Sequence, residues 1–536
     1  MPSSSSMSFQ SWLVLIAVGI LVFLINIDYT AVNLTLVPIS EEINAGLNSL
    51  QWLLSGYVLV WAAFVVLAGR LADLYGKRNS LIAGLLVFLV GSCLTGYGHT
   101  LDMLVVGRIF QGVGAALFSA PAWALVFESA PPERQGFLMG IIISFAGFGL
   151  AIGPTLAGVI IEELSWRWIF YVNIPLGFLV IAILLFFAPK DIIAKNQKKI
   201  NFPQAGVLAG TLCLSVYALN QVGTTGFTLF GSIVVACAWG ALISSFMQHK
   251  YKGVANKNQK AGLLTKLGRG EVLIPLHLFK NKPYLGATVG VGLMSMVFSM
   301  TLVMMGLYLQ NTLHYSSYQT GLIFIAMTIS MGLLGPVGGK MVDLLGTKQL
   351  MVFGTLLTFF ALGMMAFLGI DSSLFYVILC LFLVGAGLGM YFTASNTAMM
   401  QVTPPESLGV ASGVYMMWMM LGNTVSIVLS TSLVVVFGRI HLLGSLREMT
   451  FTPQQNQDLV DIIGKVEHTA AQLKDFAPET IPQLLQRIDE AFAFGLSLNM
   501  ILGIFLALGT LGFTLWGCAE KKSNPSKKKG PENSSR

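Results

Sequence analysis

One acidic side chain, Asp28, lies well inside a long apolar run near the N-terminal end of the chain. A bare carboxylate in hydrocarbon is costly, so we expect Asp28 to take up a proton, pair with a cation or face water. At about 1.5 Å of helix rise per residue, Asp28 lies about 15 Å from Pro38 at the end of its helix, and Arg108 lies about 9 Å from the same face, after Asp102. The two side chains are therefore predicted at comparable depth.

This pair suggests proton chemistry. Asp28 would exchange a proton for cargo, and Arg108 would tune the proton affinity of the carboxylate and hydrogen-bond the first helix. The alternative is a static buried ion pair that only holds two helices together.

The composition identifies lipid as the main solvent of the chain. Of its 536 residues 55% are hydrophobic and only 10% are charged, whereas a soluble domain carries about 25% charged residues. The net charge of +7 does not indicate nucleic-acid binding, because the basic residues lie in alternate loops. The five cysteines lack CxxC spacing, so we predict no disulfide framework and no metal. No P-loop or hydrolase motif occurs, so we expect neither an enzyme nor a cofactor.

Fourteen apolar runs approach the roughly 20 residues that cross a bilayer. They are 11–37, 50–69, 81–99, 104–127, 137–160, 168–188, 205–222, 228–248, 285–311, 318–338, 350–369, 373–397, 409–436 and 492–517. An even count puts both termini on one side, and most Lys and Arg residues assign that side to the cytoplasm.

A charged island between apolar runs occurs twice. Gly69 to Arg78 reads GRLADLYGKR, and Gly339 to Lys348 reads GKMVDLLGTK. Both keep Gly, a basic residue, Asp, Gly and a final basic residue at the same spacing. The first copy follows the second run and the second copy follows the tenth. Eight runs therefore separate them, which is six plus an inserted pair. Such a repeat predicts two related membrane halves, the architecture of a secondary transporter.

The predicted fold is thus an all-α integral membrane protein with 14 transmembrane helices, in two pseudo-symmetric six-helix bundles plus an inserted helix pair. Residues 1–10 form a cytoplasmic N-terminus, 11–188 the first bundle, 189–284 the inserted pair with a basic cytoplasmic linker, 285–517 the second bundle, and 518–536 a cytoplasmic tail. Residues 437–491 form an external loop, in which the amphipathic stretch 459–466 indicates a helical hairpin.

The two islands resemble the signature loop of the major facilitator superfamily. Four further motifs resemble its fourteen-helix drug:proton antiporters; they are DYTAVN from Asp28 with Pro38, RIFQGVG from Arg108, the stretch Gly149–Gly158, and WRWIFYVNIPLG from Trp166. Ala157 departs from the family pattern, which usually has Gly there.

The resemblance implies roles for two further groups of residues. Locking of the two halves at the cytoplasmic face is implied for Gly69, Arg70, Asp73, Gly76, Lys77, Arg78 and Asp343, and gating of alternating access for Gly149, Gly153, Pro154 and Gly158. The alternatives are hydrated turns with positive-inside charges for the first group and ordinary close helix packing for the second. Trp166 and Trp168 read as an aromatic belt, and Asn173 as a polar contact between helices.

Adaptable and aromatic side chains mark the candidate substrate cavity. We single out Asn33, Trp52, Tyr57, Trp61, Trp123, Met304, Tyr415, Trp418 and Asn423. The alternative is that such side chains form helix core or face lipid.

We therefore predict export of hydrophobic or cationic small molecules (multidrug efflux) by proton antiport across a bacterial cytoplasmic (inner) membrane. Two alternatives remain: a dedicated exporter of one endogenous metabolite, such as a siderophore or a lipid precursor, and a membrane scaffold that uses the 437–491 loop. Predicted partners are the substrate, protons, the lipid bilayer, and a periplasmic adaptor with an outer-membrane channel; nucleic acid is not expected.

Overall fold

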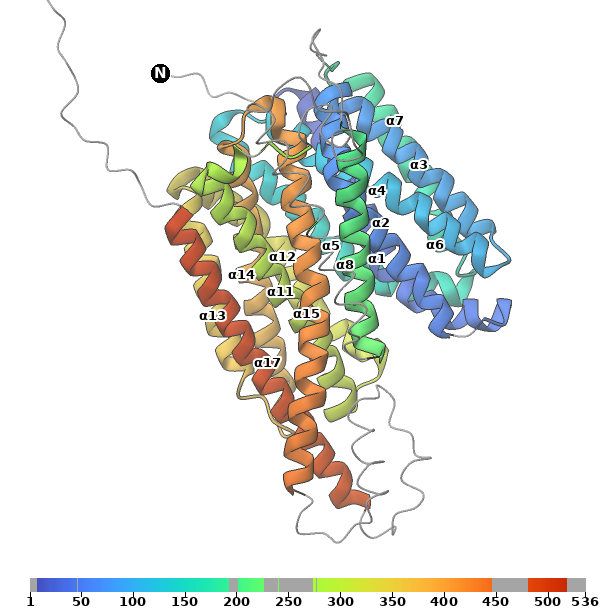
Figure 1. Ribbon diagram of the computed structural model, residues 1–536, viewed down its shortest axis with the longest axis vertical. Helices are drawn as coiled ribbons and strands as arrows, with labels where there is room; N and C mark the ends of the chain where they lie inside the picture. The colour runs from blue at the N-terminus through green and yellow to red at the C-terminus, as the bar shows by residue number, and fades with distance from the viewer. Residues whose placement is uncertain are drawn as a thin grey trace, which may run out of the picture.

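The chain folds into a bundle of long α-helices, seen in the computed structural model (Figure 1). The structure describes residues 7–45, 47–191, 201–225, 240, 273–275, 277–445 and 481–517. Within these residues, 12 helices are long and apolar enough to cross a membrane. Nearly all of the predicted run 228–248, the amphipathic stretch 459–466 and the tail 518–536 lie outside the described residues.

The helices follow the order of the predicted runs. The first half holds α1 (Phe9–Ile43), α2 (Leu47–Tyr75), α3 (Lys77–Tyr97), α4 (Leu101–Ser129), α5 (Gln135–Glu163), α6 (Trp168–Tyr171) and α7 (Asn173–Phe187). Helix α8 (Phe202–Thr225) follows. The second half holds α11 (Lys282–Leu307), α12 (Ser317–Leu345), α13 (Thr347–Met365), α14 (Leu374–Gln401), α15 (Leu408–Ser445) and α17 (Ile481–Gly517).

Local chemistry explains why these segments are helical and where several begin. An α-helix pairs its backbone N–H and C=O groups within the segment, which a chain in hydrocarbon requires. Side-chain oxygens accept from the free N–H groups of the first turn: Ser8 caps α1, Thr100 caps α4 and Ser373 caps α14. Ser316 and Gln319 form a capping box at α12.

The charged islands are helical rather than hydrated turns. Gly69 to Tyr75 form the last turns of α2, and the chain breaks only at Gly76, with φ of 100°. Gly346 breaks the second copy in the same way, with φ of 94°. Such angles favour glycine because a side chain would clash with the backbone. At Gly76 a Cβ atom would also overlap the carboxyl group of Asp191, which accepts hydrogen bonds from the start of α3.

Two helices extend far beyond their predicted runs. The apolar runs 409–436 and 492–517 lie within α15, which ends at Ser445, and α17, which begins at Ile481. Both project past the rest of the bundle at the lower end of Figure 1. Apolar length predicts the part of a helix that fits the bilayer, not where the helix ends. The segment between the two helices is therefore shorter than the predicted loop 437–491.

The halves meet mainly through two pairs of helices, α5 with α12 and α2 with α15. Helix α8 packs on both α2 and α15 (Figure 1). Its buried residues Ala205, Leu208, Ala209 and Leu212 recur at helical spacing along one face. Helix α8 therefore covers one of the two seams between the halves.

Glycine against glycine brings these helices into close contact. A Cβ atom on Gly140 would overlap the backbone of Gly335, and one on Gly69 would overlap the backbone of Gly409. Small residues allow helix backbones to approach in this way. These contacts lie toward the ends of α2 and α12 that carry the charged islands, which we call the interlock end.

We expect Gly140→Ala to loosen the interlock end. The added methyl group has no room, and overpacking costs about 1–3 kcal/mol. The thermal unfolding midpoint should fall, and the distance between spin labels at Glu133 and Lys340 should lengthen. Gly158→Ala is the matched control, because a Cβ atom there meets nothing within 4 Å. Unchanged stability and spacing in Gly140→Ala would contradict the packing described here.

Candidate functional site

Asp28 and Arg108 form a buried ion pair between α1 and α4. Arg108 Nη1 lies 2.6 Å from Asp28 Oδ2, and neither side chain is more than 1% exposed. Arg108 Nε donates to the carbonyl oxygen of Leu53 in α2 at 2.8 Å, and its guanidinium carbon stands 4.2 Å from the centre of the Tyr57 ring. A buried ion pair is tolerated when its remaining polar atoms also have partners. The Arg108 guanidinium has two further partners, the Leu53 carbonyl oxygen and the Tyr57 ring.

A chain of hydrogen bonds extends the pair to α3 and α7. Gln111 Nε2 donates to Asp28 Oδ1 at 3.2 Å and to Ser92 Oγ at 2.8 Å, and Gln111 Oε1 accepts from Arg108 Nη1 at 2.8 Å. Asn173 Nδ2 donates to Ser92 Oγ at 3.3 Å, the polar contact between helices expected for this residue. We call these five residues the ionic network.

Gln111 is not among the residues predicted from the sequence to be functional. Its position offered a signal, because Gln111 lies three residues after Arg108 and residues at that spacing share one face of a helix. An amide and a guanidinium on one buried face predict a shared partner, which is Asp28.

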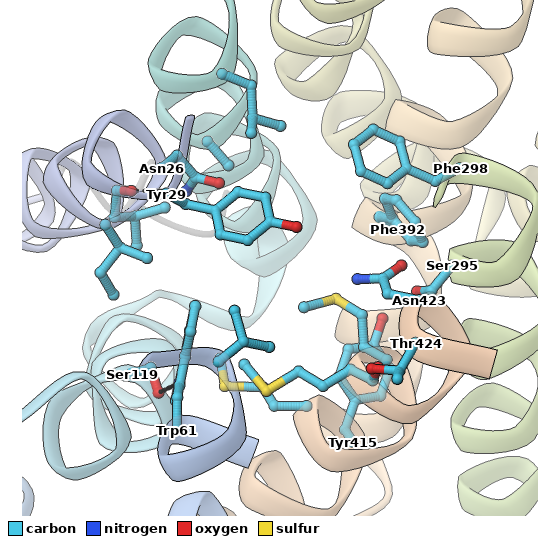
Figure 2. Close-up of a pocket in the computed structure, with 18 of the residues that line it drawn as sticks. Asn26, Tyr29, Trp61, Ser119, Ser295, Phe298, Phe392, Tyr415, Asn423 and Thr424 are labelled. Atoms are coloured by element: carbon cyan, nitrogen blue, oxygen red, sulfur yellow. Dashed lines mark hydrogen bonds between the residues drawn. The ribbon is translucent and has the colours of Figure 1, made fainter. Parts of the chain in front are cut away.

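A cavity of about 370 Å³ lies between the two halves, next to the ionic network. Residues of α1, α2, α4 and α5 line one wall, and residues of α11, α12, α14 and α15 line the other (Figure 2). Arg108 lines the cavity, whereas Asp28 does not. Of the two charged groups, only the guanidinium borders the cavity.

Five of the nine predicted cavity residues line this space. They are Asn33, Trp61, Trp123, Tyr415 and Asn423. Trp61 Nε1 donates to Ser119 Oγ at 3.0 Å across α2 and α4 (Figure 2). The other four lie elsewhere.

Two of those four, Trp52 and Tyr57, are on α2 but on faces that miss the cavity. Trp52 is 42% exposed, and its ring stacks on Tyr217 of α8 at 6.1 Å. Tyr57 is fully buried against Arg108. The other two belong to the second half. Met304 is fully buried in the hydrophobic core of the bundle. Trp418 is 37% exposed and packs against α11.

The structure adds lining residues that the sequence analysis did not single out. Among them are Asn26, Tyr29, Ser295, Phe298, Met331, Phe392, Asn396 and Thr424. One signal was available: Asn26, Tyr29 and Asn33 recur at three and four residues, which places them on one face of α1. The second-half wall carries a similar signal, because Tyr415, Met419, Asn423 and Ile427 recur at four residues on one face of α15.

Two aspartates join the halves at the interlock end. Asp73 of α2 accepts two backbone N–H groups at the start of α15, at 2.7 and 2.8 Å, and Asp343 of α12 accepts two at the start of α5, at 2.8 and 2.9 Å. A carboxylate at a helix N-terminus satisfies free donors and complements the helix dipole. The donors are Gly409 and Val410 for Asp73, and Gly136 and Phe137 for Asp343.

The donor ends of these bonds belong to, or directly follow, a second sequence repeat, which was not among the predicted motifs. Pro-Pro-Glu-x-x-Gly occurs at 131–136 before α5 and at 404–409 before α15. Each copy forms a 3-10 turn that leads into the helix. The two repeats pair crosswise, since each aspartate island meets the Pro-Pro-Glu turn of the other half.

Two basic residues of the first island, Lys77 and Arg78, bind within the first half. Lys77 Nζ lies 2.6 Å from Glu128 Oε1 of α4, and Arg78 Nη2 donates to the carbonyl oxygen of Leu185 in α7 at 2.6 Å. Arg70 lies one helical turn before Asp73 and is 9% exposed. The lock between the halves described above therefore uses the aspartates, while Lys77 and Arg78 hold α3 against its own half.

The predicted gating stretch of α5 packs within the first half. A Cβ atom on Gly149 would lie 2.8 Å from the carbonyl oxygen of Phe23, and one on Gly153 would overlap Thr30, both in α1. Pro154 follows within the helix. Gly158 meets nothing within 4 Å and so takes no part in close packing. The glycines of α5 that touch α12 are Gly136, Gly140 and Gly147.

The Trp166 motif differs from an aromatic belt in part. Trp166 is only 3% exposed, and its Nε1 donates to Glu42 Oε2 at 2.7 Å. Arg167 Nη1 lies 2.6 Å from the same oxygen. Trp168 is 51% exposed and can serve as a belt residue. Trp166 and Arg167 therefore tie α1 to the start of α6.

Two pseudo-symmetric helical halves around a shared central cavity, in a chain with 12 candidate membrane spans, define a multi-pass membrane transporter. The family model described as Major Facilitator Superfamily matches residues 18–427, and the chain belongs to that family.

Relatives with curated names point to small-molecule transport. The chain is 27% identical to the riboflavin transporter RibZ of Clostridioides difficile, over 75% of this chain and 83% of that protein. It is 28% identical to the multidrug resistance protein Stp of Mycobacterium tuberculosis, over 84% of this chain and 81% of that protein. The crystal structure of the human organic anion transporter MFSD10 (TETRAN) shares the fold, with a TM-score of 0.57, 12% identity and coverage of 93% of this chain and 99% of that one.

The ionic network predicts strong coupling between its charged members. Removing one partner of a buried pair costs about 3–5 kcal/mol. Asp28→Asn and Arg108→Gln should each lower the thermal unfolding midpoint, and the double variant should lose less stability than the sum of the two. Additive losses in this double-mutant cycle would mean that the two charges do not interact.

Proposed function

We propose that the protein exports hydrophobic compounds, cationic ones among them, in exchange for protons. The observation that carries the proposal is the buried Asp28–Arg108 pair beside a cavity that both halves line. An ionisable group inside a membrane bundle is rare and usually functional. Here it is the acidic partner that is hidden and the basic partner that reaches the cavity.

The pair offers a route for coupling. Protonation of Asp28 would remove the charge that Arg108 balances, so the guanidinium would gain freedom to shift toward Leu53 or the cavity. Cargo in the cavity would therefore meet Arg108 either paired with the ionised Asp28 or released from it. Exchange follows only if protons and cargo favour different states of the protein, because only differential affinity shifts an equilibrium.

Alternating access would use the interlock end. The four hydrogen bonds of Asp73 and Asp343, with the glycine contacts beside them, close this end. Breaking them would let the halves rock apart there around the cavity. The basic residues of both islands support a cytoplasmic position for this end under the positive-inside rule.

The finer topology also belongs to this proposal. We propose fourteen spans, both termini in the cytoplasm and a bacterial cytoplasmic membrane. The described part of α8, packed on α2 and α15, supports an inserted pair beside the two bundles. A periplasmic adaptor and an outer-membrane channel that dock at 437–491 stay a prediction from the sequence.

A dedicated exporter of one metabolite is the second candidate. A relative named a riboflavin transporter favours it, as do amide and hydroxyl groups on the cavity wall. Multidrug resistance relatives and the methionines of the wall, which adapt to varied shapes, favour broad export.

Export of ethidium from proteoliposomes tests the proposal. With an imposed proton gradient the wild type should export ethidium, and without it export should stop. Asp28→Asn keeps the side-chain shape but cannot exchange a proton, so it should lose gradient-driven export. Asp371→Asn, an exposed acidic residue between α13 and α14, should behave as wild type. Gradient-dependent export that survives in Asp28→Asn would refute the coupling role.

A further inference from the structure

Three polar side chains on the second-half wall leave oxygens without a partner. Ser295 of α11, Asn396 of α14 and Asn423 of α15 all line the cavity. Ser295 Oγ, Asn396 Oδ1 and Asn423 Oδ1 are buried and accept no hydrogen bond from the described residues. Ser295 is 1% exposed and Asn396 is 2% exposed. We call these three residues the second-half polar cluster.

Several other polar groups of the cavity walls have partners within the protein. Ser119 accepts from Trp61 at 3.0 Å, and Asn26 Nδ2 donates to the carbonyl oxygen of Val22 at 2.7 Å. On the second-half wall, Tyr415 shares a hydrogen bond of 2.7 Å with Ser395. Buried polar groups usually have partners. Of the described residues with an unpaired buried polar atom, these three are the ones that line the cavity, so a ligand there can supply the missing partner.

The chemistry of the cluster specifies that partner. Unpaired hydroxyl and amide oxygens accept hydrogen bonds, so a ligand must present N–H or O–H donors. An asparagine amide also donates, and Figure 2 shows the side chain of Asn423 directed toward the cavity. A ligand carbonyl beside the donor would meet that amide. The matching ligand edge therefore carries adjacent donor and acceptor groups.

The charge of the cavity restricts the ligand further. Among the described residues that line the cavity, Arg108 is the one charged side chain, and none is a carboxylate. A permanent cation would face this guanidinium with no anion to pair with. Aromatic rings from both halves, including Trp61, Phe298 and Phe392, give flat faces on which a planar ring can lie (Figure 2).

We propose that the second-half polar cluster binds the hydrogen-bonding edge of a flat, uncharged aromatic compound with adjacent N–H and C=O groups, and that the cavity prefers such compounds to permanent cations. This inference rests on the export function proposed above and names the class of cargo that the site takes best. The first-half wall contributes the proton chemistry, and the second-half wall contributes recognition.

Binding to the purified full-length protein tests the inference with a matched pair of ligands. Lumichrome is a fluorescent, uncharged tricycle with an imide N–H between two carbonyl groups. Its derivative methylated at both ring N–H groups keeps the ring system but loses every N–H donor. Losing one hydrogen bond should weaken binding to the wild type by about two- to tenfold. Ethidium, a planar permanent cation, should bind more weakly than lumichrome.

Variants assign the effect to the cluster. Asn423→Leu should lower the affinity for lumichrome to about that for the methylated derivative, and methylation should then have little further effect. Ser295→Ala, a smaller change, should act in the same direction. Thr431→Val is the control on α15, because Thr431 lies outside the cavity lining and donates to its own helix. Thermal unfolding midpoints would verify that each variant is folded.

Two results would overturn the inference. One is equal affinity of the wild type for lumichrome and its methylated derivative. The other is an equal loss of ethidium and lumichrome affinity in Asn423→Leu.

Transport in proteoliposomes separates this failure from failure of the proposed function. Gradient-driven export of ethidium together with methylation-insensitive binding would remove the inference and leave proton-coupled export standing. Selective binding of lumichrome without gradient-driven export of either compound would leave the binding preference standing and remove proton-coupled export.

Discussion

The first half is organised around a single constraint, that a charge placed inside an apolar bundle must be compensated there. Both oxygens of Asp28 are engaged, one by Arg108 and one by Gln111, and the guanidinium in turn reaches the backbone of α2 and the ring of Tyr57. Satisfying one carboxylate thus brings α1, α2, α3 and α4 together at one depth. The same constraint puts Arg108 at the edge of the cavity, so the most polar point of the half borders the place where cargo would bind.

The two halves are symmetric where they lock and asymmetric where they face the cavity. At the interlock end each half supplies one aspartate and one helix N-terminus, and the two exchanges are alike in geometry. At the cavity both halves present amide, hydroxyl and aromatic side chains, but among the described lining residues the charge belongs to the first half and the methionines to the second. A division of this kind suits a carrier that couples protons to cargo, because a symmetric pair of walls would offer both ligands the same surface.

The contacts at the interlock end are numerous, but each of them can break and form again. Backbone donors at a helix start can be satisfied by water when the end opens, and so can the carboxylates. Glycine pairs such as Gly140 with Gly335 have no side chains to disentangle when the helices separate. Close packing without interdigitation therefore gives a seam that can close firmly and open again, which alternating access in the proposed cycle requires.

The sequence by itself determined the helical membrane architecture, the internal repeat and the pairing of Asp28 with Arg108. These depend on local facts: apolar length, repeated spacing, and the cost of an isolated charge in hydrocarbon. Only the tertiary structure decided which faces of the helices meet. Trp52 and Met304 have the residue types of a cavity wall but turn toward α8 and the helix core, whereas Asn396 and Ser295 turn toward the cavity. Helices that are apolar nearly all round carry no moment that fixes their rotation, so their orientation comes from packing against neighbours far away in the chain.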